Sequence, residues 1–201
     1  MNKKKGLLIV FSGPSGAGKG TVLAEFWKNN ENVKYSVSAT TRKPRPGEVD
    51  GVHYHFVSRE AFEEMIAKDE IVEYTEYNGN YYGSPAAPIR KLNEEGFDVL
   101  LEIEVDGARQ VKEKFPDALS IFILPPSFEE LARRLTGRNT ETEEEIARRL
   151  DTAKKEIALA YEYDYVIVND EVEKAAEKLS AVITAAKFSK KFNREIIEEV
   201  L

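Results

Sequence analysis

The sequence contains no cysteine and only two histidines among its 201 residues. Without cysteine the chain forms no disulfides and offers no thiolate for catalysis or metal binding, as is usual in a reducing compartment. His53 and His55 flank Tyr54 at strand spacing, and two ligands alone do not make a metal site. The sequence therefore excludes cysteine chemistry, and we expect no catalytic role for histidine.

Long apolar runs and a surplus of positive charge are also missing. No apolar stretch approaches the roughly 18 residues of a membrane-spanning helix, and the opening MNKKKG does not resemble a signal peptide. The net charge of −7 argues against broad binding to nucleic acid. We therefore expect a cytoplasmic protein that binds neither membranes nor nucleic acid. An anionic ligand would need a local cluster of basic residues.

What the sequence does contain is an alternation of apolar segments and segments with helical periodicity. Ser127 with Glu130, and Thr142 with Glu145, have the spacing of capping boxes at helix starts. Strands alternating with helices predict an α/β fold with a parallel sheet covered on both faces. Strands are expected at residues 7–13, 97–105, 120–126 and 165–170, and helices at residues 21–29, 108–115, 128–135 and 146–161.

A segment from about Ser36 to Ser84 breaks this alternation. It is polar or alternating, rich in Tyr and Thr, and interrupted by PRPGEVDG. This composition predicts a small mixed or antiparallel sheet inserted into the α/β domain. The charged stretch 187–201 is expected to form a surface helix or a frayed end.

The glycine-rich segment GPSGAGKGT follows the first apolar strand and precedes a helix, the setting of a phosphate-binding loop. Its glycines allow backbone N–H groups to surround phosphate oxygens at the positive end of a helix dipole. We expect Lys19 to neutralise the β- and γ-phosphates. The predicted ATP-binding residues of the loop are Gly13, Pro14, Ser15, Gly16, Ala17, Gly18, Lys19, Gly20 and Thr21.

Gly20 stands where this loop usually has a hydroxyl that holds Mg²⁺. Either Thr21 takes over, or the metal is held by water, the nucleotide and a carboxylate from elsewhere. The best such carboxylate is Glu102, which ends the apolar VLL run as a Walker-B acid would.

Two arginines, Arg42 and Arg45, lie three residues apart in the proline-stiffened loop TTRKPRPGEVDG. Arginine binds phosphate bidentately, so this loop suits the phosphate of a nucleoside monophosphate. Tyr54, Tyr82 and Ser84 add hydroxyls to the same region. Glu73 adds a carboxylate, which accepts hydrogen bonds only and therefore suits the N1–H and 2-amino donors of guanine but not adenine.

Together, the segments GPSGAGKGT, SVSATTRKPRPGEVDGVHYHFV, EYNGNYYGSP, EIEVDGARQV, IFILPPS, GRNTETEEEIARRL and YDYVIVND resemble guanylate kinases. The resemblance covers residues 6–186 and implies a P-loop kinase fold with a core, a GMP-binding region at about 36–96 and a helical lid at about 127–149. It implies transfer of phosphate from ATP to GMP or dGMP with Mg²⁺, in a monomer or weak homo-oligomer. Members of this family also read GKGT in the loop, as this chain does.

The resemblance also implies roles for individual residues. Arg138 and Arg149 match lid and hinge arginines that act in catalysis with Lys19 and Arg42, and Asn169 matches a position near the adenine. The implied GMP-binding residues are Ser38, Arg42, Arg45, Tyr54, Glu73, Tyr82, Ser84 and Glu104.

Several positions depart from the family pattern. Asp106 stands where Gln is usual, Asn139 replaces a common Gly, and Glu102 and Glu104 replace one or two Asp residues. The division of roles among Glu102, Glu104 and Asp106 therefore stays open. Two other functions also stay open: a guanylate kinase-like domain that binds phosphopeptides, and a kinase acting on AMP or a pyrimidine nucleotide. Against the first, the chain keeps an intact phosphate loop and Ser38.

Overall fold

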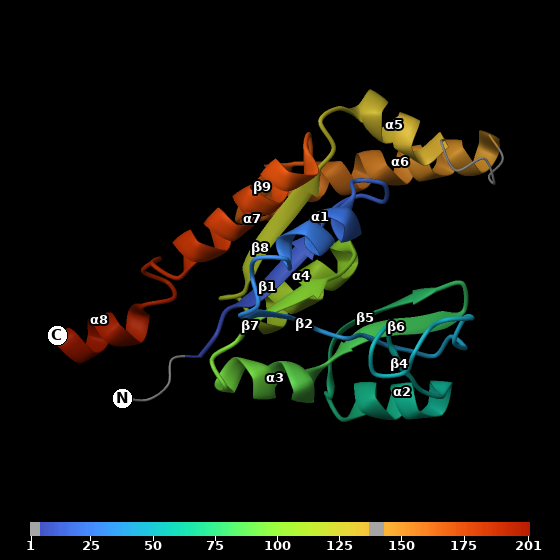
Figure 1. Cartoon of the computed structure of the whole chain (residues 1–201). Coiled ribbons are helices and arrows are strands. Elements are labelled where there is room, and N and C mark those ends of the chain that lie inside the picture. Colours follow the sequence, from blue (N-terminus) through green and yellow to red (C-terminus); the bar gives the residue numbers. More distant parts are fainter. Residues whose placement is uncertain (1–4, 137–142) are drawn as a thin grey trace. The chain divides into compact units, whose positions relative to one another are not determined.

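The computed structural model describes residues 5–136 and 143–201. Its contacts divide the chain into two compact units, each made of two separate stretches. Unit 1 contains residues 1–10 and 32–118, and unit 2 contains residues 11–31 and 119–201. Figure 1 labels most of the helices and strands of both units.

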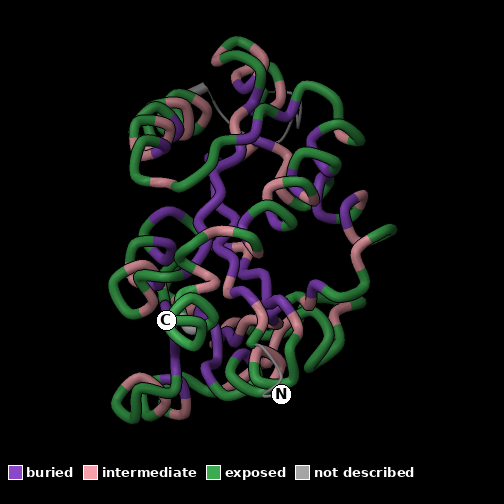
Figure 2. The backbone as a smooth tube through the Cα atoms, turned by 90° about the vertical axis from the view of Figure 1, so that its left-hand side faces the viewer, coloured by how far each residue is buried: buried purple, intermediate pink, exposed green. Residues whose placement is uncertain are grey.

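A five-stranded sheet has the strand order β2-β7-β1-β8-β9. The pairs β2/β7 and β8/β9 run parallel. Residues such as Ile9, Phe11 and Phe122 are fully buried, and buried backbone, drawn in purple, runs through the middle of Figure 2. Such continuous apolar runs are typical of parallel strands covered on both faces. The strands are β1 (Leu8–Ser12), β2 (Val33–Tyr35), β7 (Asp98–Glu102), β8 (Leu119–Leu124) and β9 (Tyr165–Val168).

Helices α1, α5 and α6 of unit 2 follow the predicted alternation, whereas α7 was not predicted. Helix α1 packs against α7, and in α5 and α6 the buried Leu131, Leu135 and Ala153 form one cluster. The Ser127 Oγ accepts a hydrogen bond from the Glu130 N–H at 3.1 Å, which confirms the predicted cap. Thr142, of the other predicted cap, lies outside the described residues. The elements are α1 (Lys19–Phe26), α5 (Phe128–Thr136), α6 (Glu143–Ala158), a 3-10 turn (Leu159–Glu162), α7 (Val172–Ala186) and α8 (Arg194–Val200).

Unit 1 contains a second sheet of four strands in the order β4-β3-β6-β5. Strands β3 and β4 run parallel, whereas β3/β6 and β5/β6 run antiparallel. The predicted mixed sheet is therefore confirmed, and with the parallel sheet and its helices it confirms the fold class. The strands are β3 (Ala39–Thr40), β4 (His55–Phe56), β5 (Ile71–Tyr77) and β6 (Asn80–Pro85).

Two helices of unit 1 were not predicted. Helix α2 (Arg59–Ala67) begins at Ser58, whose Oγ accepts from the Ala61 N–H at 3.1 Å. Its Phe62 is fully buried against Ala39 and Ile71 of the mixed sheet. Helix α3 (Ala86–Glu94) follows β6 directly. Helix α2 was missed because only one of its side chains is fully buried, which leaves a weak apolar pattern.

The strand predicted at residues 97–105 is shorter than expected. Strand β7 ends at Glu102, and helix α4 (Val105–Lys114) begins with Glu104 as its N-cap residue. Val105 ends the apolar run but is the first residue of the helix and is buried there. The expectation was wrong here because an apolar run cannot separate a strand from the buried face of the helix that follows it.

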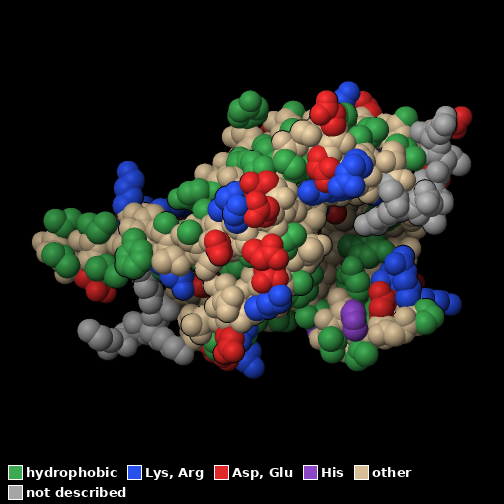
Figure 3. All heavy atoms as spheres, turned by 45° about the horizontal axis from the view of Figure 1, so that its top comes forward, with side chains coloured by type: hydrophobic (Ala, Val, Ile, Leu, Met, Phe, Trp, Pro, Cys, Tyr) green, Lys and Arg blue, Asp and Glu red, His purple; other side chains and the backbone are tan. Residues whose placement is uncertain are grey.

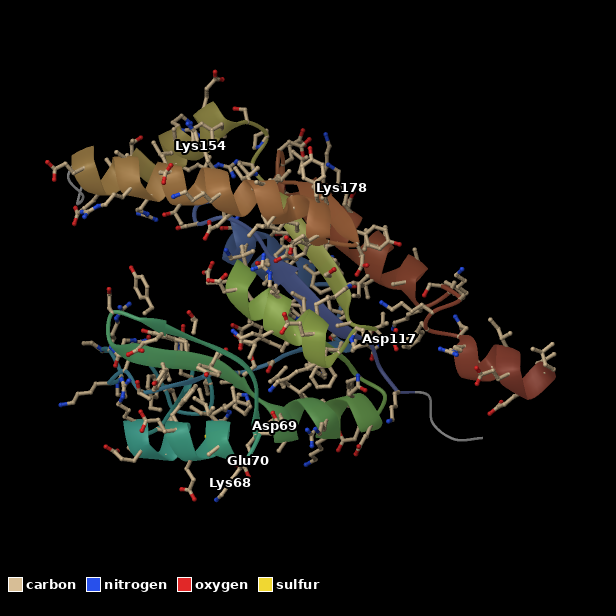
Figure 4. The ribbon with its side chains drawn as sticks, turned by 180° about the vertical axis from the view of Figure 1, so that it is seen from behind. Lys68, Asp69, Glu70, Asp117, Lys154 and Lys178 are labelled. Atoms are coloured by element: carbon tan, nitrogen blue, oxygen red, sulfur yellow. The ribbon has the colours of Figure 1, made fainter. Side chains whose placement is uncertain are left out.

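The surface carries charges of both signs. Blue and red side chains lie next to each other over the face in Figure 3. Figure 4 labels Lys178, which pairs with Asp170 at 3.3 Å, and Lys154, whose Nζ lies 4.9 Å from the centre of the Phe128 ring. Within residues 5–136 and 143–201, no helix is both long and apolar enough to span a membrane.

Candidate active site

The glycine-rich loop joins β1 to α1 in unit 2. Gly16 and Gly18 have φ angles of 88° and 91°, in the left-handed region that other residues rarely adopt. The loop turns tightly, with the Ala17 N–H donating to the Pro14 carbonyl at 3.1 Å, and α1 begins at Lys19. The first N–H groups of a helix have no partner within that helix, so a loop of this shape at the start of α1 has the geometry expected of a phosphate loop.

Three side chains hold this loop in place. Asn169, only 3% exposed, donates from Nδ2 to the Ala17 carbonyl at 2.8 Å. Arg149 on α6 donates to the Ser15 Oγ at 2.9 Å. The Lys19 Nζ donates to the Gly13 carbonyl at 2.5 Å, so its ammonium group lies over the loop. The structure thus brings Lys19, Arg149 and Asn169 together around the loop.

Arg134 is a further loop contact that sequence reasoning missed. From α5 it donates to the carbonyls of Ala17 and Asn169, at 3.3 Å each, and it pairs with Glu130 at 2.8 Å. The signal in the sequence was the pair of arginines in FEELARRL, which a solvated helix face explains equally well. Arg138, predicted to be catalytic, lies outside the described residues.

Gly20 differs from the other loop glycines. Its φ is not in the left-handed region, and a Cβ added there would meet no described atom within 4 Å. Neither backbone strain nor packing in the described part of the chain therefore requires glycine. Thr21, the next residue, is exposed in the first turn of α1. Glu102 ends β7 in unit 1 and is partly buried.

The loop between β3 and β4 carries the predicted phosphate clamp of unit 1. The guanidinium of Arg42 forms a bidentate pair with Glu48, at 2.8 and 2.9 Å. It lies 5.5 Å from the ring centre of Tyr54 and 5.8 Å from that of Phe56. Its side chain is 15% exposed. Arg42 is thus held in one orientation by an internal carboxylate and two aromatic rings.

Glu48 is the second residue that sequence reasoning missed. Besides Arg42, it accepts a hydrogen bond from the Arg45 N–H at 2.7 Å. These contacts lower the pKa of Glu48 to about 2, with the Arg42 hydrogen bond as the largest cause. They also raise the pKa of Arg42. The spacing of the two residues in RKPRPGE was the available signal, but a charged turn residue is usually only solvated.

The other predicted phosphate contacts lie around this clamp. The rings of Tyr54 and Tyr82 meet edge to face with their centres 6.0 Å apart, and Tyr82 adds to the effect of Glu48 in raising the pKa of Arg42. Burial raises the pKa of Tyr54, so its hydroxyl remains a donor. Arg45 is exposed. Ser38, just before β3, is partly buried, and its carbonyl accepts from the His55 N–H at 2.8 Å.

Glu73 and Ser84 form a buried pair across strands β5 and β6. The Ser84 Oγ donates to Glu73 Oε1 at 2.7 Å, and Glu73 is 4% exposed. Burial raises the pKa of Glu73 to about 6, and the hydrogen bonds from Ser84 oppose this shift. A carboxylate kept out of water has a strong need for donors, which is the chemistry predicted for recognition of a guanine ring.

The remaining acidic residues have different surroundings. Glu104 is exposed at the N-cap of α4, and Asp106 is exposed in the first turn of that helix. No group of three or more His, Asp or Glu side chains suited to a metal occurs in the described part of the chain. The side chains described here could therefore contribute single ligands to a nucleotide-bound metal, but not a cage of their own.

A family model described as Guanylate kinase matches residues 5–186 of the chain. A guanylate kinase of Halalkalibacterium halodurans is 56% identical over 185 residues, which cover 92% of this chain and 91% of that protein. A guanylate kinase of Lactococcus lactis subsp. lactis is 57% identical over 183 residues, covering 91% of this chain and 89% of that protein. These similarities extend over both units.

Solved structures include a similar fold. The crystal structure of a guanylate kinase from Anaplasma phagocytophilum matches with a TM-score of 0.75 and 35% sequence identity. The match covers 98% of this chain and 96% of that one.

Burial of Glu73 gives a prediction for stability. Since its pKa is raised from 4.5 to about 6 in the folded protein, its ionised form opposes folding by about 2 kcal/mol. This cost is present above pH 6 and disappears as the pH falls towards 4.5, where the unfolded chain is protonated too. Urea unfolding should therefore find Glu73→Gln more stable than the parent by up to about 2 kcal/mol at pH 7.5.

The difference in unfolding free energy should shrink towards zero near pH 4.5. Glu113→Gln, a change of the same kind at an exposed position on α4, is the control and should leave stability unchanged at both pH values. A Glu73→Gln effect that does not vary with pH would contradict the assigned cause.

Proposed function

The chain belongs to the guanylate kinase family, and we propose that it transfers the γ-phosphoryl group of ATP to GMP or dGMP, giving ADP and GDP or dGDP. The observation that carries this proposal is the buried Glu73–Ser84 pair, which lies in the same unit as the Arg42 clamp. One offers acceptors to a guanine ring, and the other offers donors to a phosphate. Unit 2 supplies the phosphate loop for ATP.

The reaction needs little from the protein in the way of acid or base catalysis. An anionic oxygen of the GMP phosphate attacks the γ-phosphorus, a new O–P bond forms, and the bond to the β–γ bridging oxygen breaks. ADP leaves with that electron pair, so no proton must be removed. Alignment and neutralisation of the charge on the phosphoryl oxygens supply the rate enhancement.

We assign these tasks to the basic residues of the two units. Lys19 is placed over the phosphate loop, and Arg149 also reaches that loop through Ser15. Both suit the negative charge of the transferring group. Arg42 binds the acceptor phosphate, with Arg45, Tyr54 and Tyr82 around it. Ser38, Ser84, Glu73 and Glu104 serve the guanine side, and Asn169 serves the adenine side in addition to its bond to Ala17.

Mg²⁺ is the metal that we propose for the reaction. It prefers oxygen ligands and keeps several waters, so the protein needs to supply only one or two. The exposed hydroxyl of Thr21, beside the open space at Gly20, fits as one ligand, and the Glu102 carboxylate is the second candidate. When bound, the ion neutralises charge on the phosphate oxygens.

We further propose that the protein acts on free nucleotides in the cytoplasm, as a monomer or weak homo-oligomer. One domain over residues 6–186, including a GMP-binding region at about 36–96 and a lid at about 127–149, would carry the activity.

A panel of acceptor nucleotides tests the function. With ATP and Mg²⁺, ADP formation in a coupled assay should be fast with GMP and dGMP and slow with AMP and CMP. Faster turnover of AMP or CMP would assign another nucleoside monophosphate kinase activity. No turnover of any acceptor, with tighter binding of a phosphopeptide than of GMP, would indicate an interaction domain.

Lys19→Met should reduce kcat by about 100- to 1,000-fold, because it removes a charge that acts on the transferring phosphoryl group. The dissociation constant for GMP, measured by calorimetry, should change less than about 2-fold, since the proposed GMP contacts lie in unit 1. Lys28→Met, at an exposed position just after α1, is the matched control and should retain full activity. An unchanged kcat for Lys19→Met would refute the role of Lys19.

Removal of a metal ligand should raise the Mg²⁺ concentration needed for half-maximal activity by about 10-fold or more. We expect this for Thr21→Val, which keeps the shape of the side chain but loses the hydroxyl, and for Glu102→Gln if it is the second ligand. Thr184→Val, exposed on α7, is the control. If neither variant shifts the Mg²⁺ dependence, both assignments are wrong.

A further inference from the structure

One face of α4 is fastened along β5, the strand that carries Glu73. Three residues of α4 that contact this strand are Gly107, Gln110 and Lys114, at positions i, i+3 and i+7 of the helix. This spacing places them on a single stripe. All the contacts lie within unit 1.

Gly107 lies directly against the Glu73 carboxylate. A Cβ added at Gly107 would be 3.1 Å from Glu73 Cδ and 3.5 Å from Cγ, and it would overlap Oε2. Gly107 is buried within the helix and its φ is not in the left-handed region. The backbone conformation there is one that any L-amino acid can adopt. The nearby carboxylate is therefore what requires glycine.

Gln110 contacts the residue after Glu73. Its Oε1 accepts from the Tyr74 N–H at 3.1 Å, and its Nε2 donates to the Tyr74 carbonyl at 2.8 Å. Strand β5 is at the edge of the mixed sheet, and the amide of Gln110 pairs with it as another strand would. Gln110 thus fixes the backbone position of Tyr74, and with it the start of the Glu73 side chain.

The strand needs such a clamp because its pairing is irregular at this point. Ile71 lies opposite Pro85, whereas Tyr74 lies opposite Gly83, so β5 has one residue more than β6 between these pairs. A bulge of this kind leaves the ladder locally disrupted and redirects a side chain. The extra residue lies within Val72–Glu73, next to Ser84, the partner of the carboxylate.

Lys114 fastens the other end of the stripe. Its Nζ donates to the Ile71 carbonyl at 3.0 Å and to Asp69 at 2.7 Å. Asp69, labelled in Figure 4, lies in the turn before β5 with a φ of 53°. The helix therefore holds β5 on both sides of Glu73, with Gln110 after it and Lys114 before it.

We propose that Gly107 and Gln110 are positioning residues that hold the Glu73 carboxylate in register with the guanine ring, and so set the preference for a purine with a 2-amino group. This inference rests on the proposed function. A carboxylate accepts from guanine N1–H and from its 2-amino group at once only in one orientation. A small displacement would lose one of these bonds, and with it the discrimination against hypoxanthine, which has only N1–H.

The first test is the variant Gly107→Ala, whose Cβ displaces the carboxylate. Calorimetry should show that the affinity for GMP falls by about 10-fold or more, that the affinity for IMP falls less, and that the ratio of the two drops accordingly. The KM for ATP should not change. If Gly107 were an ordinary helix glycine, alanine would only stabilise the helix, so a raised melting temperature with an unchanged GMP-to-IMP ratio would overturn the proposal.

Gln110→Met is the second variant, and it keeps the proposal testable if Gly107→Ala does not fold. Methionine keeps the size and helix propensity of glutamine but makes neither bond to Tyr74. The KM for GMP should rise by about 3- to 10-fold with kcat and the KM for ATP nearly unchanged. Glu113→Gln, exposed on the same helix, is the control. If Gln110→Met had the same KM for GMP as the control Glu113→Gln, the proposed role of Gln110 would be contradicted.

A double-mutant cycle tests whether Gly107 acts through Glu73. Aspartate is shorter by one methylene, so Glu73→Asp should leave room for the Cβ of Gly107→Ala. The two changes together should therefore reduce GMP affinity by clearly less than the product of their separate effects. Independent effects would overturn the inference. The inference about Gly107 and Gln110 can fail while the proposed function stands, because the parent protein would still phosphorylate GMP. The proposed function fails only if the parent protein does not phosphorylate GMP.

Discussion

Unit 1 keeps one carboxylate, that of Glu73, almost completely out of water, and the neighbouring side chains are arranged around this constraint. Glu73 is 4% exposed, and burial raises its pKa to about 6. At neutral pH the group therefore opposes folding, and its surroundings must limit that cost. Ser84 donates to one oxygen, and Gly107 leaves space for the other. Under the proposed function, the site for the donors of a base would thus be built around a group that lowers the stability of the fold.

Under the proposed function, the two units would bind anions by different physical means. In unit 2 the donors are backbone N–H groups. Gly16 and Gly18 allow the loop to turn, and Asn169 holds the loop by donating to the Ala17 carbonyl. Unit 1 uses a side chain, Arg42, whose orientation is fixed by Glu48 and by aromatic rings. Both arrangements order their donors before a ligand binds, which reduces the entropy that binding must overcome.

The sequence predicted those features of the fold that depend on residues close to one another in the chain. The phosphate loop and the strand before it are local, and the structure places them as expected. Glu73 and Ser84 could each be proposed as site residues from the sequence. The bulge next to them could not, because a single extra residue in a tyrosine-rich strand leaves no pattern in the sequence. Asn169 reaches a loop 152 positions earlier in the sequence, a contact that depends on the folded chain. Glu48 is close in sequence to Arg42 and was still missed, because turn charges are usually solvated.

Glycine shows most clearly why sequence alone leaves such roles undecided. Gly18 is needed for its left-handed backbone, and Gly107 is needed because a carboxylate occupies the place of its side chain. Gly20 is needed for neither reason within the described structure, since the space beside it is open. The three residues read identically in the sequence. At Gly20 the fold therefore sets no requirement for glycine, and under the proposed function the missing hydroxyl does not by itself argue against a working loop.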